Sequence, residues 1–460
     1  MSFWINFIFT FARRKKWLII SLTAAFLLAV TVGVYLFNLK KQDVLSEGIV
    51  GTHEERDLPD IVLNLISSPL IRVDKSGTPI AQLAQSWESN EQANVYKVKL
   101  KENLYWSDGE KLTAADVYLS IPDVSINALD ESTLEFKLAE TFSPFPTLLT
   151  KPVLRKASTQ FGFELVGVGP YSVKAVKKDG PFVKRLDLEA SEEKLPDLDI
   201  TFYPSEKIAK TALKLGEVQS LLGVIESDDL SLNNLGRKVV TNYRQLVTVF
   251  LNTEDPILSD ENLRLALAYG SPEFAGQEIA QTPLSPFSWA HNNTVKDFLN
   301  NNEKAQVALK KVEKGKEEQI SLTATSSLER VGEKVVESWK NLGLNAVLRV
   351  ESGIPQNFQA LLITQNIPAD PDQYSLWHST QKNGTNISRV ASPRIDKDLE
   401  DGRKITDLET RKQKYKDFQK ILLDQAPAIF LYFPKYEVVY MKKAEKQLNE
   451  ILPIQLIHLN

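Results

Sequence analysis

The sequence has no cysteine and only four histidines among its 460 residues. Without thiols the chain forms no disulfide bond, offers no thiolate to a metal ion and has no cysteine nucleophile or lipid-bearing cysteine. P-loop and G-x-S-x-G motifs are missing, and the histidines form no H-x-x-x-H pair. They are His53, His291, His378 and His458. We therefore expect no metal, no cofactor and no enzymatic activity, although a Ser/His/Asp triad assembled only in space stays an open alternative.

Basic side chains are scarce relative to acidic ones outside the N-terminus. Residues 1–41 carry six basic side chains and no acid. Since the whole chain carries a net charge of −4, residues 42–460 carry −10. Nucleic acid is bound by a basic face, so this acidic body excludes nucleic acid as the expected partner.

A long hydrophobic run occurs only once, at 17–37, where 21 consecutive residues carry no charge. About 20 apolar residues cross a bilayer, and the four basic residues before this run favour a cytoplasmic N-terminus. We predict a cytoplasmic basic lead at 1–16, a transmembrane anchor at 17–37, a tether at 38–47 and an external main domain at 48–460. The expected location is the cell membrane, with one span and the main domain extracellular or periplasmic. A cleaved signal peptide and a buried core helix are the alternatives.

Four segments of the main domain have strand patterns. Val95–Leu100 and Thr133–Leu138 alternate polar and apolar residues, which predicts half-buried strands. Gln245–Asn252 and Ala428–Phe433 are mostly apolar and predict buried strands.

Helical patterns lie between these strands. After Ser259-Asp260-Glu261, which supply a cap and acids, a helix is predicted up to Gly270. Ile320–Thr325, a helical repeat from Leu328 to Leu342, and Ala346–Val350 predict a βαβ unit. Alternating strands and helices indicate an α/β fold.

The most informative segment is 106–117, which reads W-S-D-G-E-K-L-T-A-A-D-V. Its first residues favour a turn, and Thr113 with Asp116 has the pattern of a capping box at a helix start. This segment resembles the signature of the family 5 extracellular solute-binding proteins of ABC importers. Residues 77–88, G-T-P-I-A-Q-L-A-Q-S-W-E, are similar to the family's G-x-P-x-x-x-L-A-x-S-W-E.

Further segments resemble the family in the same order over roughly 48–440. They are 166–171 (V-G-V-G-P-Y), 250–269 with its F-L-N and R-L-A-L-A-Y, 303–309 (E-K-A-Q-V-A-L), 369–372 (A-D-P-D) and 392–396 (S-P-R-I-D). The resemblance implies a two-lobed, periplasmic-binding-protein-like (type II) fold with a ligand cleft between the lobes. Lobe I is expected at about 48–248 plus 434–460, and lobe II at about 253–430.

The resemblance also implies a function. Such a protein captures a peptide or another small extended solute and delivers it to ABC permease subunits whose ATPase is a separate chain. In this account the N-terminal helix attaches it to the membrane. The alternative is a surface receptor without a transport role, or a chaperone-like peptide holder, on the same fold.

Two departures from the family pattern bear on the ligand. Only Tyr118–Ser132 separates Val117 from the strand at Thr133–Leu138, where relatives carry a longer insertion, so a more open cleft is expected. Relatives place an acid ahead of the D-P-D motif to pair with a peptide's amino group, whereas this chain has Asn366-Ile367-Pro368 there. A buried ammonium without a paired carboxylate is costly. Capture of a free peptide N-terminus is therefore not expected to follow the family pattern.

Five candidate ligand-binding residues follow from where relatives approach their ligand. Thr52 and His53 follow a first strand, with a surface loop as the alternative reading of His53. Tyr374, Trp377 and His378 follow the D-P-D motif, and aromatic residues offer large contact area with few rotors. Packing in the core of the larger lobe is their alternative.

Five more candidates lie elsewhere in the chain. Phe287 and Trp289 belong to a possible cleft loop, with ordinary packing as the alternative. Asn386 and Ile387 are candidates for hydrogen bonds to a bound backbone, with a loop cap as the alternative. Asn252 lies at the expected crossing between lobes and has a structural role as its alternative.

Overall fold

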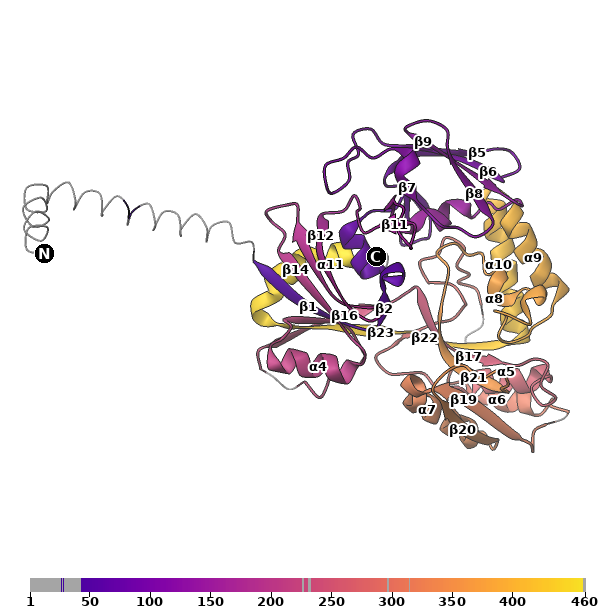
Figure 1. Cartoon of the computed structure of the whole chain (residues 1–460). Coiled ribbons are helices and arrows are strands. Elements are labelled where there is room, and N and C mark those ends of the chain that lie inside the picture. Colours follow the sequence, from indigo (N-terminus) through magenta and orange to yellow (C-terminus); the bar gives the residue numbers. More distant parts are fainter. Residues whose placement is uncertain are drawn as a thin grey trace, which may run out of the picture.

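The computed structural model describes residues 43–225, 227–230, 233–295, 298–313 and 315–457, together with Phe26 and Leu28. Three main sheets make up this part of the chain (Figure 1). The largest lies on the left of the view, the smallest at the top and the third at the lower right.

The structure contradicts the predicted single-pass location in the cell membrane. Among the described residues, no helix is both long enough and apolar enough to cross a bilayer. The predicted anchor at 17–37 and basic lead at 1–16 lie outside the described residues, apart from Phe26 and Leu28.

The large sheet has eight strands within the described residues. Its order is β12 (Tyr171–Asp179), β13 (Phe182–Ala190), β14 (Asp197–Tyr203), β1 (Val44–Val50), β15 (Ser220–Val224), β23 (Lys435–Met441) and β16 (Leu235–Thr241), with β2 (His53–Glu54) paired to β13. Strand β1 runs parallel to both β14 and β15. Helices α3 (Asp60–Ile66) and α11 (Glu445–Gln455) pack on one face, and α4 (Glu206–Leu215) packs on the other.

The predicted tether at 38–47 ends inside this sheet. Residues 38–42 lie outside the described part, but β1 begins at Val44 and carries Leu45 and Glu47, both fully buried. β1 pairs with β14 on one side and with β15 on the other, and this buried pairing decides the structure of the segment. The polar residues of the sequence do not indicate a buried strand.

The small sheet forms the upper part of Figure 1. Its strand order is β5 (Ala84–Ser89), β6 (Val95–Leu100), β9 (Thr133–Leu138) and β8 (Val124–Ala128). Beside it lie the pair β3 (Ile71–Val73) and β4 (Pro79–Ala81), and the strands β11 (Phe163–Glu164), β10 (Leu154–Lys156) and β7 (Val117–Tyr118). Both strands predicted from alternation, β6 and β9, are confirmed with their predicted bounds.

The helix predicted after Thr113 is shorter than expected. The capping box between Thr113 and Asp116 is present, but it caps a single 3₁₀ turn, η2 (Ala114–Asp116). The chain then pairs at once as β7 with β10, so the helix cannot continue. The other 3₁₀ segments are η1 (Glu55–Asp57), η3 (Phe145–Thr150), η4 (Ser326–Leu328), η5 (Ser379–Gln381) and η6 (Lys442–Ala444).

The third main sheet, at the lower right of Figure 1 and called the second sheet from here on, holds the predicted βαβ unit. Its order is β18 (Glu278–Ile279), β22 (Ala428–Phe433), β17 (Gln245–Leu251), β21 (Ala360–Asn366), β19 (Gln319–Thr325) and β20 (Asn345–Glu351). One face packs on α5 (Glu261–Tyr269), α6 (Asn302–Leu309) and α7 (Glu329–Asn341), and the other on α8 (Tyr374–Trp377), α9 (Pro393–Lys404) and α10 (Leu408–Gln425). The parallel β19–α7–β20 unit and helix α5, capped by Asp260, confirm the predictions for these segments.

The chain passes twice between the large and the second sheet. It leaves β16 at Thr241 and enters β17 at Gln245, and it returns from β22 to β23 through Pro434. The lobe boundaries expected from the sequence, at about 248–253 and 430–434, stay a prediction. β17 begins at Gln245, a few residues before the first boundary.

Candidate functional site

Carboxyl ends of parallel strands from both sheets lie beside these two crossings. In the second sheet, β21 ends at Asn366, which pairs with Gln245 at the start of β17. In the large sheet, β15 ends at Val224, which pairs with Glu437 near the start of β23. Ligands of α/β proteins bind outside the carboxyl ends of strands. This region is therefore the candidate site.

Four segments meet at this place, and we call them together the junction: 74–78, 242–244, 286–291 and 367–372. The Trp289 N–H donates to the Ser76 carbonyl at 3.0 Å, and the Ile367 N–H donates to the Arg244 carbonyl at 2.8 Å. Tyr243 packs edge-on against Phe287, with 4.8 Å between ring centroids. The junction thus joins the β3–β4 turn to loops of the second sheet.

The β3–β4 turn is held rigid by one carboxylate. Asp74 Oδ1 accepts hydrogen bonds from the Ser76 N–H at 2.8 Å, the Ser76 hydroxyl at 2.6 Å and the Thr78 N–H at 2.9 Å. Burial opposes ionisation, but these bonds hold the pKa of Asp74 below its usual value. Gly77 in this turn has a φ of +87°, and a Cβ built on it lies 2.2 Å from the Ala369 carbonyl oxygen. The turn therefore fits against the 367–372 segment only with glycine at this position.

A buried ion pair between Asp370 and Arg411 holds the 367–372 segment in place. Asp370 accepts from Arg411 on α10 at 2.7 Å, and both side chains are less than a tenth exposed. The Arg411 guanidinium also lies 5.2 Å from the Trp289 ring centroid and 5.5 Å from that of Tyr415. Buried charges need such partners, so this pair fixes the loop that carries the D-P-D motif.

A second ion pair, between Arg403 and Asp372, lies beside residues that follow β9 of the small sheet. Arg403 on α9 donates to Asp372 at 3.0 Å and lies over the rings of Tyr374 and Phe142, at 4.3 and 4.8 Å from their centroids. Its carbonyl accepts the Ser143 N–H at 2.8 Å. Burial raises the pKa of Asp372 to about 6, although Arg403 opposes the shift.

The predicted residues after the D-P-D motif are engaged within the protein. Tyr374 stacks on His378 with 4.0 Å between centroids. His378 is buried and contacts Thr380 and Glu400 at 2.8 and 3.3 Å. Trp377 is fully buried and donates to Gln373 at 2.7 Å. These contacts match the packing alternative, most fully for Trp377.

Asn386 and Ile387 follow in a loop of the same region. The Asn386 amide is fully buried and donates to the carbonyl oxygens of Trp377, His378 and Val390. Ile387 packs at the margin of the core between the second sheet and α8–α10. The Asn386 geometry is that of the loop cap named above.

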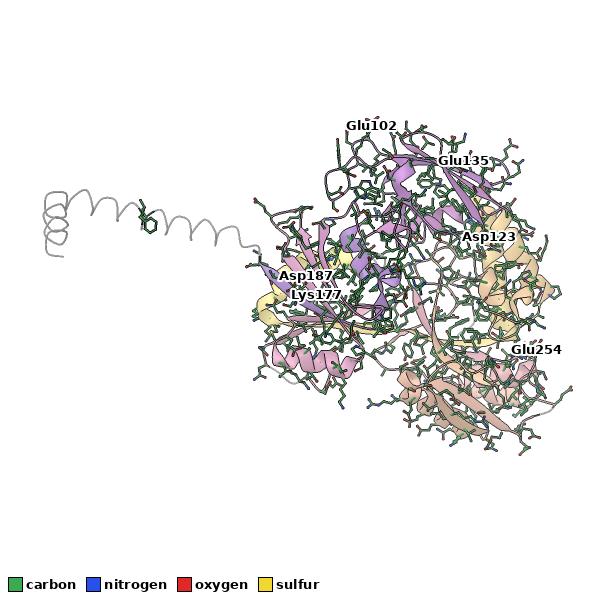
Figure 2. The ribbon with its side chains drawn as sticks, in the orientation of Figure 1. Glu102, Asp123, Glu135, Lys177, Asp187 and Glu254 are labelled. Atoms are coloured by element: carbon green, nitrogen blue, oxygen red, sulfur yellow. The ribbon has the colours of Figure 1, made fainter. Side chains whose placement is uncertain are left out.

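Thr52 and His53 follow β1, and Asn252 follows β17. Thr52 is exposed, while the half-buried His53 ring lies 5.2 Å from that of Phe202. Asn252 lies at the end of β17 away from the crossing, where its amide donates to the Phe358 carbonyl at 3.1 Å. Its neighbour Glu254 lies on the outer right side of the molecule (Figure 2). The structure does not bring Asn252 to the junction.

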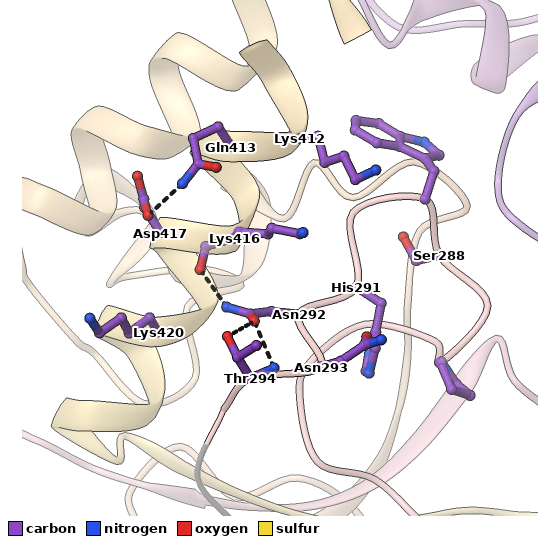
Figure 3. Close-up of a pocket in the computed structure, with 12 residues that line it drawn as sticks. Ser288, His291, Asn292, Asn293, Thr294, Lys412, Gln413, Lys416, Asp417 and Lys420 are labelled. Atoms are coloured by element: carbon purple, nitrogen blue, oxygen red, sulfur yellow. Dashed lines mark hydrogen bonds between the residues drawn. The ribbon is translucent and has the colours of Figure 1, made fainter. Parts of the chain in front are cut away.

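Phe287 and Trp289 lie in the junction, and a pocket of about 610 Å³ opens beside Trp289. The 286–294 loop and α10 line it (Figure 3). Lys412 and Lys416 reach from α10 toward this loop, where Asn292 donates to the Lys416 carbonyl at 3.1 Å. Among the described residues, no group of three or more His, Cys, Asp or Glu side chains is placed to hold a metal ion.

Sequence reasoning missed the arginines around the junction. The signal for Arg411 is a charged residue four positions before Tyr415, on a helix face that is otherwise apolar. The signal for Arg244 is a charged residue directly before the apolar strand at 245–251. The signal for Arg411 does not reveal its partner, because Asp370 comes from a distant segment.

Comparison with known proteins identifies the family to which this fold belongs. Residues 78–386 match the model described as bacterial extracellular solute-binding proteins, family 5 Middle. The chain belongs to the family 5 bacterial extracellular solute-binding proteins. The junction therefore lies in a fold of mixed α/β, two-lobed binding proteins, and the resemblance found in the sequence is confirmed.

Individual relatives are distant. The chain is 26% identical to the oligopeptide-binding protein AppA of Bacillus subtilis, with 83% of each chain covered. It is 23% identical to the probable D,D-dipeptide-binding periplasmic protein DdpA of Escherichia coli, covering 81% of this chain and 83% of the relative. NikZ of Campylobacter jejuni, solved in complex with Ni(L-His), superposes with a TM-score of 0.70 at 22% identity, over 87% of this chain and 94% of that one. At this identity the structural likeness shows the fold alone.

Proposed function

We propose that this chain captures a peptide, or a similar small extended solute, at the junction and delivers it to the permease of an ABC importer. The ATPase of the importer is then a separate chain, since this sequence has no P-loop. Family membership carries the proposal, and the relatives named for oligopeptide and dipeptide binding support the peptide class. No observation favours a receptor or holder without a transport role.

The two crossings supply a mechanism for capture. We propose that the large and small sheets with their helices form one lobe and the second sheet with its helices forms the other. Rotation about 242–244 and Pro434 then opens and closes the junction, as in hinge closure around ligands. The 74–78 turn contacts Trp289 and Ala369, and we propose that these contacts belong to the closed arrangement.

Candidate ligand contacts follow from this arrangement. We propose Phe287, Trp289, Tyr374, Thr52 and His53 as residues that a solute at the junction approaches. Trp377, His378, Asn386 and Ile387 act behind them by holding the loop after the D-P-D motif. Binding without catalysis is the role we propose, in line with relatives that are binding proteins.

Calorimetric titration tests the proposal. The full chain is titrated with a synthetic set spanning dipeptides to nonapeptides, and small-angle scattering is recorded with and without the tightest binder. We expect saturable heat for at least one length class and a smaller radius of gyration in its presence. Absence of binding across the set contradicts the proposed function.

A further inference from the structure

Arg244 differs from two other buried arginines of this protein. Its side chain is half-buried, yet within the described residues its guanidinium makes no hydrogen bond and no ion pair. Arg264 is more buried and donates to the carbonyl oxygens of Leu258, Ser259 and Gln425. Arg411 is paired with Asp370. Arg244 therefore has unused donors, whereas these two buried arginines find acceptors.

The backbone places Arg244 at the junction. Its carbonyl accepts the Ile367 N–H, which continues the β17–β21 ladder by one residue beyond Gln245 and Asn366. Arg244 lies in the turn before β17, where the Gln245 N–H donates to the Asn242 carbonyl at 3.2 Å. Its neighbour Tyr243 packs edge-on against Phe287 of the 286–291 loop, and the charge of Asp74 in the β3–β4 turn acts on the Arg244 guanidinium. Arg244 therefore belongs to the junction.

Asp74, the neighbouring acid, does not accept a hydrogen bond from the Arg244 guanidinium. Asp74 is the charge that acts on Arg244, and it does so without a hydrogen bond or an ion pair to the guanidinium. Its Oδ1 already accepts two N–H groups and a hydroxyl from its own turn. Burial lowers the pKa of Arg244, and the charge of Asp74 only partly opposes this.

A partly desolvated cation without an acceptor is costly, and an anion that supplies one gains a charge-assisted hydrogen bond. Guanidinium presents a planar fork that matches a carboxylate with two parallel bonds. We propose that Arg244 binds a carboxylate of the captured solute at the junction. The proposal rests on the proposed function and narrows its solute to one that carries a carboxylate, either the free C-terminus of a peptide or an acidic side chain.

Paired peptides test this on the full chain. Each member of the dipeptide-to-nonapeptide set is prepared as the free acid and as the C-terminal amide, and peptides with an internal Glu are matched to the same peptides with Gln. Calorimetry is run on wild type, Arg244→Gln and Arg244→Lys. Arg394→Gln is the control, because it removes the same charge from an exposed position on α9. Thermal unfolding of each variant checks that it is folded.

We expect wild type to bind the carboxylate form about 10- to 100-fold more tightly than its neutral match, in line with hydrogen bonds to charged groups. The pair that shows the difference identifies the carboxylate as terminal or internal. Arg244→Gln should remove this preference, Arg244→Lys should keep part of it, and Arg394→Gln should keep all of it.

Two results overturn the proposal alone: a wild type that binds peptides but ignores the carboxylate, and an Arg244→Gln variant that keeps the wild-type preference. A wild type that binds no peptide of the set overturns the proposed function and this inference with it.

Discussion

The backbone N–H of Trp289 donates to the carbonyl oxygen of Ser76 at 3.0 Å. This bond joins a loop of the second sheet to the β3–β4 turn beside the small sheet, two segments far apart in the sequence. Backbone atoms make it, so it depends on the position of the turn and not on the identity of either side chain. The bond therefore reports whether the two parts of the fold are in contact.

Substitution of Gly77 should break this contact. In Gly77→Ala the new Cβ meets the Ala369 carbonyl oxygen at 2.2 Å, and the positive φ adds roughly 1–2 kcal/mol. Gly180→Ala is the matched control, because its φ is +59° but no atom lies within 4 Å of the new Cβ. Urea denaturation should show a loss of stability in both variants. Only Gly77→Ala should have a larger radius of gyration and weaker peptide binding, and equal behaviour of the two variants would show that the turn does not hold the junction closed.

Removal of the Asp370 charge should destabilise the protein strongly. Asp370→Asn leaves Arg411 buried without a counter-charge, which costs about 3–5 kcal/mol. Glu131→Gln is the control, since its pair with Lys111 is well exposed and contributes little to stability. Chemical denaturation of the two variants measures the difference. A loss below about 1 kcal/mol in Asp370→Asn would argue that the pair does not support the 367–372 segment.

Stability should fall as pH rises through the range in which Glu47 titrates. This carboxyl is fully buried, and burial raises its pKa from 4.5 to about 7, despite hydrogen bonds from Gln455 and Ser220. The folded state therefore holds the proton more tightly than the unfolded state. Stability is lost as pH rises from about 4.5 to about 7, by roughly 3 kcal/mol for this group.

Glu47→Gln should remove this part of the pH dependence and raise the stability above pH 7 relative to wild type. Glu102→Gln, at an exposed position on the small-sheet side (Figure 2), should leave it unchanged. The free energy of unfolding is measured by urea denaturation across the pH range. An unchanged slope in Glu47→Gln would mean that other groups produce it.

Trp289 should report solute binding by its fluorescence. Its ring lies beside Arg411 and Tyr415, and its backbone contacts the β3–β4 turn. A solute that enters the junction changes this environment, whereas Trp87 lies away from it in β5. The emission change of the wild type on adding peptide should be lost in Trp289→Phe and kept in Trp87→Phe. The opposite pattern would place the binding site nearer the small sheet.

Local patterns sufficed to predict much of the fold. β6 and β9 followed from alternation, β17 and β22 from their apolar runs, and the β19–α7–β20 unit from its change of period. Each pattern arises because a face of the element is buried whatever the partner is. The segment at 44–47 and the turn after Thr113 were not predicted, because pairing with distant strands overrides their local composition.

The candidate site was less predictable. Phe287 and Trp289 were predicted near it, and the structure places them in the junction. Asn252 lies at the far end of its strand, and Trp377 serves the core. The unpaired state of Arg244 has no trace in the sequence, because it depends on which atoms the β3–β4 turn brings close.

Native mass spectrometry of the purified full chain tests the central claim most directly. A protein that captures peptide-like solutes should carry discrete added masses matching short peptides. Arg244→Gln purified in parallel should carry fewer of those that bear a carboxylate. A chain that carries no added mass, and that takes up none after incubation with the dipeptide-to-nonapeptide set, would contradict the account.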